Sequence, residues 1–263
     1  MRAPFMAGNF PFPVKYGYST VGRAEAGDLQ GRAVFALHPH QSVFALPANA
    51  LTAIPDDVPL ARAILAANME TALNAIWDGA PGPGDRIAVV GAGVVGALVG
   101  YLCARLPGTQ VTLVDVDPSR AALAHTLGAG FAAPNQAPQD CDIVFHASGS
   151  GAGLTTALAL AGDEARVIEL SWYGAGEIGV ALGGAFHSRR LQLVSSQVGR
   201  VAPSHRTRWS HARRLAAALA LLNDARLDAL IAPPVAFTEL PQRLPKILAP
   251  GSGVLCQRID YPA

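Results

Sequence analysis

The sequence predicts an α/β protein built on a doubly wound parallel sheet, with a smaller β-rich part before it. From residue 86 onward, short runs of β-branched and aliphatic residues alternate with helical segments. Such apolar runs are typical of strands buried on both faces. Alternation of strands and helices is typical of a parallel sheet covered by helices. Residues 1–55 instead contain short strand-like runs broken by glycine and proline, which indicates a separate β-rich segment.

The composition limits the class of protein. The chain has 263 residues, of which 51% are hydrophobic and 15% charged, enough for one large domain or two modest ones. A formal charge of +1 and the lack of a basic stripe argue against nucleic acid or an anionic membrane as a partner. The three cysteines lie far apart and indicate neither a disulfide framework nor a structural zinc site. Free thiols and the lack of a signal sequence lead us to expect a cytoplasmic protein.

The elements are expected in the following order. A mostly buried helix is predicted from Pro59 to Ala80, preceded by Asp56 or Asp57 as a cap, and residues 80–85 form a linker. The later strands are expected at 86–90, 110–117, 141–149 and 165–174, and the later helices at 94–106, 118–129, 153–162 and 209–224. We therefore predict domains at 1–79 and 84–230, with residues 231–263 returning to the first domain.

Residues 91–96, GAGVVG, match the G-x-G-x-x-G pattern between a predicted strand and a predicted helix. Gly91 allows the tight turn, Gly93 lets the backbone approach a pyrophosphate, and Gly96 brings helix and strand together. The helix start at Val94 and Val95 supplies N–H groups to the anion. The alternative is a membrane span, because residues 87–104 carry no charge. The strand pattern that follows favours a dinucleotide site of the Rossmann type.

Asp115 ends the next predicted strand, nineteen residues after Gly96. A carboxylate there can accept hydrogen bonds from the ribose hydroxyls of NAD and would repel the 2′-phosphate of NADP. Arg120 would soften that preference. Alternatively, Asp115 or Asp117 caps the following helix, an interpretation that suits Asp117 better.

In this order of elements, with GAGVVG, VDVDPSR and DIVFHASG, the chain resembles the medium-chain dehydrogenase/reductase family, the zinc-type alcohol dehydrogenase superfamily. The resemblance covers nearly the whole chain. GYSTVGR and HPHQ are similar to a branch near the bacteriochlorophyllide dehydrogenases. The resemblance implies a Rossmann domain and a partial, N-terminally truncated GroES-like catalytic domain that the chain enters partway.

The same resemblance implies that the catalytic zinc site is missing. The family's Gly-His-Glu-x-x-Gly stretch aligns with residues 17–22, so Tyr18 replaces the zinc-binding histidine and Ser19 the glutamate. The third ligand position falls at Ala67. A catalytic zinc needs about three protein ligands, so a zinc-independent protein is expected.

The cofactor positions carried over from the family are better matched. Thr71 corresponds to a residue beside the nicotinamide, and the strand ends that touch its ring or carboxamide correspond to Ala147, Leu170 and Trp172. Ser195 and Ser196 match the segment that crosses the nicotinamide ribose. The family's late basic residue near the pyrophosphate is replaced by Cys256.

Without zinc, side chains must stabilise the charge on the substrate oxygen and donate a proton. Tyr18 is a candidate donor, or it simply fills the space of the metal. His40 is a candidate proton relay, with surface-loop histidines at 38 and 40 as the alternative. Glu70 could face the cleft or lie on a helix surface. His146 and His187 are expected to be structural, and an apolar substrate wall is suggested by Trp172, Tyr173 and Phe186.

Two classes of function follow. The first is an NAD(H)-dependent, zinc-independent oxidoreductase that acts on an alcohol/carbonyl pair of a small or apolar substrate, or on an activated double bond as a quinone or enoyl reductase does. The second is a truncated dinucleotide-binding protein without turnover. A homodimer is expected to pair through residues 169–182 as a sheet edge.

Overall fold

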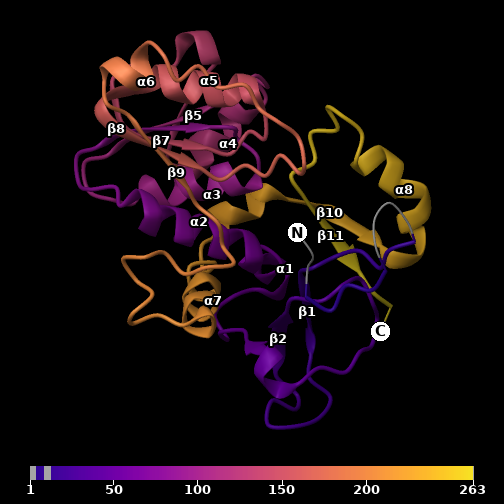
Figure 1. Cartoon of the computed structure of the whole chain (residues 1–263). Coiled ribbons are helices and arrows are strands. Elements are labelled where there is room, and N and C mark those ends of the chain that lie inside the picture. The colour runs from indigo at the N-terminus through magenta and orange to yellow at the C-terminus, as the bar shows by residue number, and fades with distance from the viewer. Residues whose placement is uncertain (1–3, 9–12, 263) are drawn as a thin grey trace. The chain divides into compact units, whose positions relative to one another are not determined.

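The computed structural model describes residues 4–8 and 13–262, and its chain divides into two compact units (Figure 1). One unit contains residues 1–69 and 212–263, and the other contains residues 70–211. The domain limits expected at residues 79, 84 and 230 stay a prediction. Each unit is described by itself.

The unit of residues 70–211 contains a six-stranded sheet in the order β6-β5-β4-β7-β8-β9, with every neighbouring pair parallel. The strands are β4 (Arg86–Val90), β5 (Gln110–Val114), β6 (Gly130–Ala132), β7 (Cys141–His146), β8 (Ala161–Glu169) and β9 (Gln192–Ser195). The first strand of this sheet in sequence, β4, lies between β5 and β7, so the strand order reverses direction at this place. The predicted doubly wound α/β fold is confirmed.

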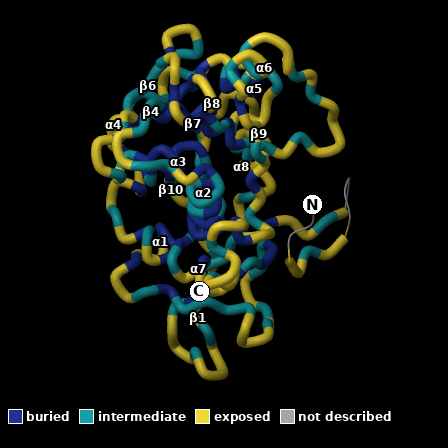
Figure 2. The backbone as a smooth tube through the Cα atoms, turned by 60° about the vertical axis from the view of Figure 1, so that its left-hand side comes forward, coloured by how far each residue is buried: buried dark blue, intermediate teal, exposed yellow. Residues whose placement is uncertain are grey.

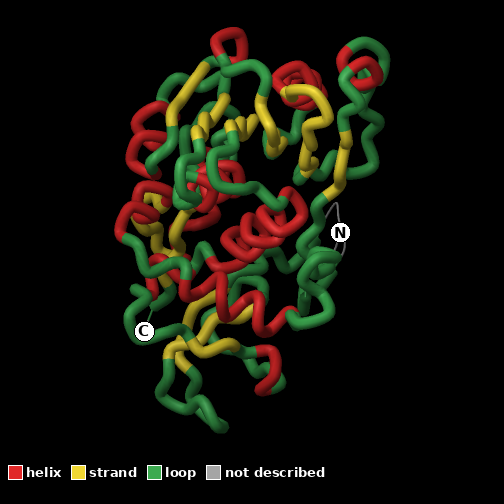
Figure 3. Tube along the Cα trace, turned by 90° about the vertical axis from the view of Figure 1, so that its left-hand side faces the viewer, coloured by secondary structure: helices red, strands yellow, loops and turns green. Residues whose placement is uncertain are grey.

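Helices connect these strands, and Figure 3 shows helical segments on either side of them. They are α3 (Val94–Cys103), α4 (Arg120–Leu127), α5 (Gly151–Leu160) and α6 (Ala185–Ser188). The charge-free stretch 87–104 is therefore a strand, a turn and a helix. Among the described residues, no helix is both long and apolar enough to cross a bilayer.

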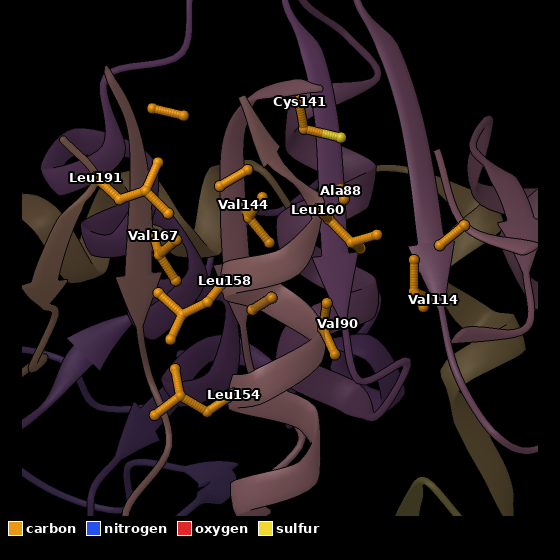
Figure 4. Packing of buried hydrophobic residues seen from close by; sticks show 14 residues of the cluster. Ala88, Val90, Val114, Cys141, Val144, Leu154, Leu158, Leu160, Val167 and Leu191 are labelled. Atoms are coloured by element: carbon orange, nitrogen blue, oxygen red, sulfur yellow. The ribbon is translucent and has the colours of Figure 1, made fainter. Parts of the chain in front are cut away.

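The sheet forms because its strands can bury both faces. Ile87, Ala88 and Val89 of β4 are each fully inaccessible to solvent, and burial of Ile87 and Val89 contributes about 1.5–3 kcal/mol each. On one face, Leu154 and Leu158 of α5 pack against Val144 and Val167 of the strands (Figure 4). Figure 2 shows buried residues gathered in the regular elements and exposed residues in the loops.

Two short strands of this sheet were absent from the sequence prediction. The strands β6, with the sequence GFA, and β9, with QLVS, are only three and four residues long. Neither run has the continuous β-branched pattern that identifies a buried strand. They form because β5 and β8 offer backbone hydrogen-bond partners at the two sides of the apolar centre of the sheet.

The expected sheet edge at residues 169–182 is wrong. β8 ends at Glu169 and is flanked by both β7 and β9, and residues 170–184 contain no strand. The outer strands of this sheet are β6 and β9.

The predicted helix over residues 59–80 is divided into α1 (Leu60–Ala63) and α2 (Ala66–Gly79). At the break, the hydroxyl of Ser19, which is distant in the sequence, donates to the Ile64 carbonyl over 2.7 Å. In a continuous helix that carbonyl would accept from the N–H group four residues later. The limit between the two units falls inside α2, after Met69.

The other unit holds an antiparallel sheet of β1 (Thr20–Arg23), β2 (Ala33–Ala36) and β3 (Thr52–Ala53), and a parallel pair of β10 (Ile231–Ala236) and β11 (Cys256–Asp260). Its remaining helices are α7 (His211–Ala220), which begins at the limit between the units, and α8 (Leu240–Ile247). Arg62 of α1 is buried and makes a two-pronged ion pair with Asp228, with both N–O distances 2.8 Å. This pair connects the N-terminal and C-terminal parts of the unit.

Candidate functional site

The glycine-rich turn lies between β4 and α3, at the carboxyl end of β4. Gly91 has a φ of +101°, which favours glycine. A Cβ added there would lie 2.6 Å from the backbone nitrogen of Ser148, at the end of β7. The turn is therefore packed against the neighbouring strand at the reversal of the strand order, where α/β sheets bind their ligands.

The two other glycines of the motif have different surroundings. A Cβ at Gly96 would lie only 1.9 Å from the carbonyl oxygen of Gly91, so helix and strand are in close contact there. Around Gly93, no atom lies within 4 Å of an added Cβ. Gly93 precedes the first helical residues, Val94 and Val95, whose N–H groups have no acceptor inside the helix. The turn thus presents open backbone and the positive end of α3 to solvent.

Asp115 follows β5 and contacts the glycine turn directly. Its Oδ2 accepts a hydrogen bond of 2.7 Å from the N–H of Ala92, and its Oδ1 accepts one of 2.9 Å from the N–H of Asp117. Asp117 accepts from the N–H of Ser119 over 2.9 Å and lies 3.3 Å from Arg120. Hydrogen bonds from Ser119, with a smaller contribution from the charge of Arg120, lower the pKa of Asp117. Asp117, and not Asp115, thus contacts the residues at the start of α4, Ser119 and Arg120.

The other predicted cofactor residues in this unit lie at carboxyl ends of the next strands. Ala147 follows β7 and its N–H donates to the Val90 carbonyl of β4, and Leu170 follows β8 and donates to the His146 carbonyl. Ser195 is the last residue of β9. Trp172 is 64% exposed. These residues and the glycine turn share one edge of the sheet.

Glu70 and Thr71 belong to the part of α2 that is in the same unit. Glu70 is buried, so the alternative of a carboxylate on the helix surface is wrong, and Thr71 is half-buried. Farther along α2, Asp78 accepts a 2.7 Å hydrogen bond from the hydroxyl of Ser196, just after β9. α2 is thereby attached to the segment expected to cross the nicotinamide ribose.

Tyr18 and His40, the other candidate catalytic residues, belong to the unit of residues 1–69 and 212–263. Burial, Tyr16 and Cys256 raise the pKa of Tyr18, against a smaller opposing effect of a hydrogen bond with Asn68. The phenol therefore keeps its proton at neutral pH.

The His40 ring is half-buried, and burial lowers its pKa. Its Nδ1 is 2.8 Å from the hydroxyl of Tyr261, a partner that no sequence pattern indicated. His38 is buried and stacked on Phe44, with ring centroids 3.7 Å apart. The alternative of two surface-loop histidines is wrong.

The residues at the three expected zinc-ligand positions do not fit a zinc ion. Ala67 is buried and has no donor side chain, and the Ser19 hydroxyl is bound to the Ile64 carbonyl. The Tyr18 phenol is held in its protonated form. In the part of the chain that the structure describes, no three His, Cys, Asp or Glu side chains are grouped so that they could hold a metal.

The suggested apolar substrate wall is only partly available. Phe186 packs against the hydrophobic core of the sheet and α5, so it is not a wall residue. The hydroxyl of Tyr173 donates to Glu169 over 3.0 Å, and only Trp172 is largely exposed.

The fold and the glycine turn define the class of protein, an α/β chain with a Rossmann-type unit and a smaller β-rich unit. No family model matches the chain. Half of it is 28% identical, over 144 residues, to an uncharacterized zinc-type alcohol dehydrogenase-like protein of Haemophilus influenzae, and the match spans 42% of that protein's length.

Solved dehydrogenase structures share the fold. Galactitol-1-phosphate dehydrogenase of Escherichia coli has a TM-score of 0.76 at 18% identity, over 93% of this chain and 84% of its own. An alcohol dehydrogenase of Escherichia coli CFT073, complexed with NADH, has a TM-score of 0.70 at 16% identity, over 92% and 81%. A putative zinc-binding dehydrogenase of Sinorhizobium meliloti, bound to NADP, has a TM-score of 0.67 at 18% identity, over 89% and 66%. The chain thus shares the fold of these dehydrogenases, and the resemblance to zinc-type alcohol dehydrogenases recognised in its sequence is confirmed.

Proposed function

We propose that this protein is an NAD(H)-dependent, zinc-independent oxidoreductase that acts on an alcohol/carbonyl pair of a small or apolar substrate. The observation that carries the proposal is the glycine turn, open at Gly93 and bound on one side by the carboxylate of Asp115. Turns of this kind at the reversal of the strand order are dinucleotide sites. A cytoplasmic location and a homodimer through β6 or β9 belong to the same proposal.

The residues present fit a dinucleotide. The N–H groups of Val94 and Val95 would meet the pyrophosphate, and Asp115 the adenosine ribose. The strand ends at Ala147, Leu170, Trp172 and Ser195, with Thr71 of α2, would surround the nicotinamide. A bound nicotinamide supplies a hydride donor or acceptor.

NAD is favoured over NADP because a carboxylate at Asp115 would repel a 2′-phosphate. Arg120 does not offset this charge by itself, since its guanidinium already pairs with Asp117. The related structures carry NADH in one case and NADP in another, so the preference rests on Asp115.

The proton for the substrate oxygen is assigned to side chains. Tyr18 supports this role because its phenol is protonated at neutral pH, although burial raises its pKa and makes it a weaker acid. His40 supports a relay because a lowered pKa keeps the ring neutral near pH 7, and Tyr261 holds its Nδ1. Glu70 is proposed as the third catalytic group on the basis of its burial next to Thr71.

Replacing Asp115 with alanine is expected to weaken NADH binding by about 10–100-fold, since a hydrogen bond to a charged group contributes about 1.5–3 kcal/mol. NADPH binding should weaken less, because the repulsion of its phosphate also disappears. The measurement is a fluorescence titration of each cofactor, with Asp117→Ala as the matched control. Unchanged NADH affinity in Asp115→Ala would contradict the ribose contact.

Chelator-treated protein is expected to oxidise NADH with at least one member of a panel of aldehydes, ketones and quinones. The rate should stay the same before and after chelation, because no step is assigned to zinc. Metal analysis of the same preparation is the control, and one zinc per chain together with loss of activity on chelation would overturn the zinc-free proposal. Saturable NADH binding without oxidation by any compound would favour the binding protein without turnover.

A further inference from the structure

A chain of hydrogen-bonded side chains lies at the carboxyl ends of β7 and β8. His146, the last residue of β7, is fully buried. Its Nδ1 lies 2.7 Å from Oε2 of Glu169, and its Nε2 lies 2.6 Å from Oγ of Ser148. His146 and Glu169 are paired in register across the two parallel strands. A serine, a histidine and a carboxylate are thus connected in series, with the imidazole in the middle.

The carboxylate is held firmly in its ionised form. Oε1 of Glu169 accepts a 2.7 Å hydrogen bond from the N–H of Ser171, and Oε2 accepts one of 3.0 Å from the hydroxyl of Tyr173. Burial opposes ionisation, but the hydrogen bonds from His146 and Ser171 lower the pKa of Glu169 overall. An ionised Glu169 requires that Nδ1 of His146 carries the proton. Nε2 is then free to accept from the hydroxyl of Ser148.

Ser148 is exposed and lies over the first turn of α5. A Cβ added at Gly153 would lie 2.0 Å from the Ser148 Oγ, so only glycine leaves room for this hydroxyl. Ser150 donates to the same oxygen from its backbone N–H, over 3.3 Å, and its own hydroxyl lies 3.1 Å from it. The Ser150 side chain also accepts from the N–H of Gly153 at the start of α5. The Ser148 hydroxyl therefore lies beside the N-terminal turn of α5, whose positive end favours negative charge on its oxygen.

We propose that Ser148, His146 and Glu169 form a nucleophilic site for acyl esters, distinct in chemistry from hydride transfer and independent of any cofactor. Such sites are recognised by the geometry and roles of their members, not by their order in the sequence. Ser148 is the nucleophile, His146 the general base, and Glu169 the group that fixes the imidazole tautomer. Attack on an ester places a negative charge on the carbonyl oxygen, which needs hydrogen-bond donors. The backbone N–H groups of Gly151 and Ala152, in the first turn of α5, have no acceptor inside the helix. They follow Ser148 closely in the chain and are assigned this role.

The chemical step is balanced. The Ser148 Oγ attacks the ester carbonyl carbon and its proton moves to the Nε2 of His146. The bond from that carbon to the leaving oxygen then breaks, and the leaving alkoxide takes the proton from His146. Water, deprotonated in turn by His146, hydrolyses the acyl-serine and returns the hydroxyl of Ser148.

The same hydrogen bonds could serve a purely structural role, in which the Ser148 hydroxyl is not activated. A covalent probe distinguishes this structural role from a nucleophilic site. A fluorophosphonate reacts with an activated serine by forming an oxygen–phosphorus bond and releasing fluoride. We expect it to label the full-length protein, without cofactor, on the peptide that contains Ser148, as read by mass spectrometry. Ser148→Ala should abolish this label. Ser188→Ala, which removes another exposed serine of the same unit, should leave it unchanged.

Glu169→Gln is expected to slow the labelling by about 10²–10⁴-fold because an amide stabilises the wrong imidazole tautomer. His146→Gln should slow it similarly. Thermal melting of each variant, Ser148→Ala included, shows whether it is folded. Unlabelled Ser148 in the folded wild-type protein would overturn the proposal, as would labelling that is equally fast in folded Glu169→Gln. Neither outcome bears on NADH binding, which a separate titration measures.

Discussion

Gly96→Ala is expected to destabilise the protein by about 1–3 kcal/mol, the range for overpacking a well-packed site. The added Cβ would lie 1.9 Å from the carbonyl oxygen of Gly91. That oxygen belongs to backbone, and the Gly91 turn is itself packed against Ser148, so neither can move away easily. Alanine improves helix propensity over glycine by about 1 kcal/mol, which does not offset a clash with backbone. Thermal unfolding should show the loss as a lower midpoint, by about 2–4 °C per kcal/mol.

Gly100→Ala is the matched control on the same helix. Its added Cβ would lie 2.5 Å from Cδ2 of Leu113, the end of a flexible side chain that can rotate. We expect a smaller loss of stability than in Gly96→Ala. Equal midpoints for Gly96→Ala and the wild type would show that α3 and β4 are not in the close contact described here.

Gly93→Ala is expected to leave stability nearly unchanged and to weaken NADH binding by at least about tenfold. Its φ of −71° suits alanine, and no atom lies within 4 Å of the added Cβ. The cost to the folded protein is that of a poorer helix cap, about 0.5–1 kcal/mol. The methyl group would instead occupy the space in which a pyrophosphate approaches the backbone. Gly93 and Gly96 are thus expected to separate binding from folding within one motif.

Much of the larger unit could be predicted from the sequence. The runs at 87–90 and 143–145 are apolar throughout, which identifies strands buried on both faces, and β4 and β7 form around them. The short strands β6 and β9 could not be found, because their pairing depends on neighbours and not on their own residues. The break between α1 and α2 depends on Ser19, a residue 45 positions from Ile64.

The candidate site was predicted less completely. Spacing alone located Gly91, Gly93, Gly96 and Asp115, since the motif is local. The contact of Asp115 with the N–H of Ala92 needed the three-dimensional arrangement of β4 and β5. The pairing of His146 with Glu169 needed the register of β7 and β8. A histidine and an acid that end adjacent parallel strands are the signal that could have revealed that pair.

The proposed dinucleotide site is tested most directly by a titration of wild-type protein and Gly93→Ala with NADH, followed by cofactor fluorescence at matched folded concentrations. We expect saturable binding to the wild type and at least about tenfold weaker binding to Gly93→Ala, equivalent to about 1.4 kcal/mol. Melting curves of the two proteins should differ little. Wild-type protein that binds neither NADH nor NADPH, or Gly93→Ala that binds NADH as tightly as the wild type, would contradict a dinucleotide site at the glycine turn.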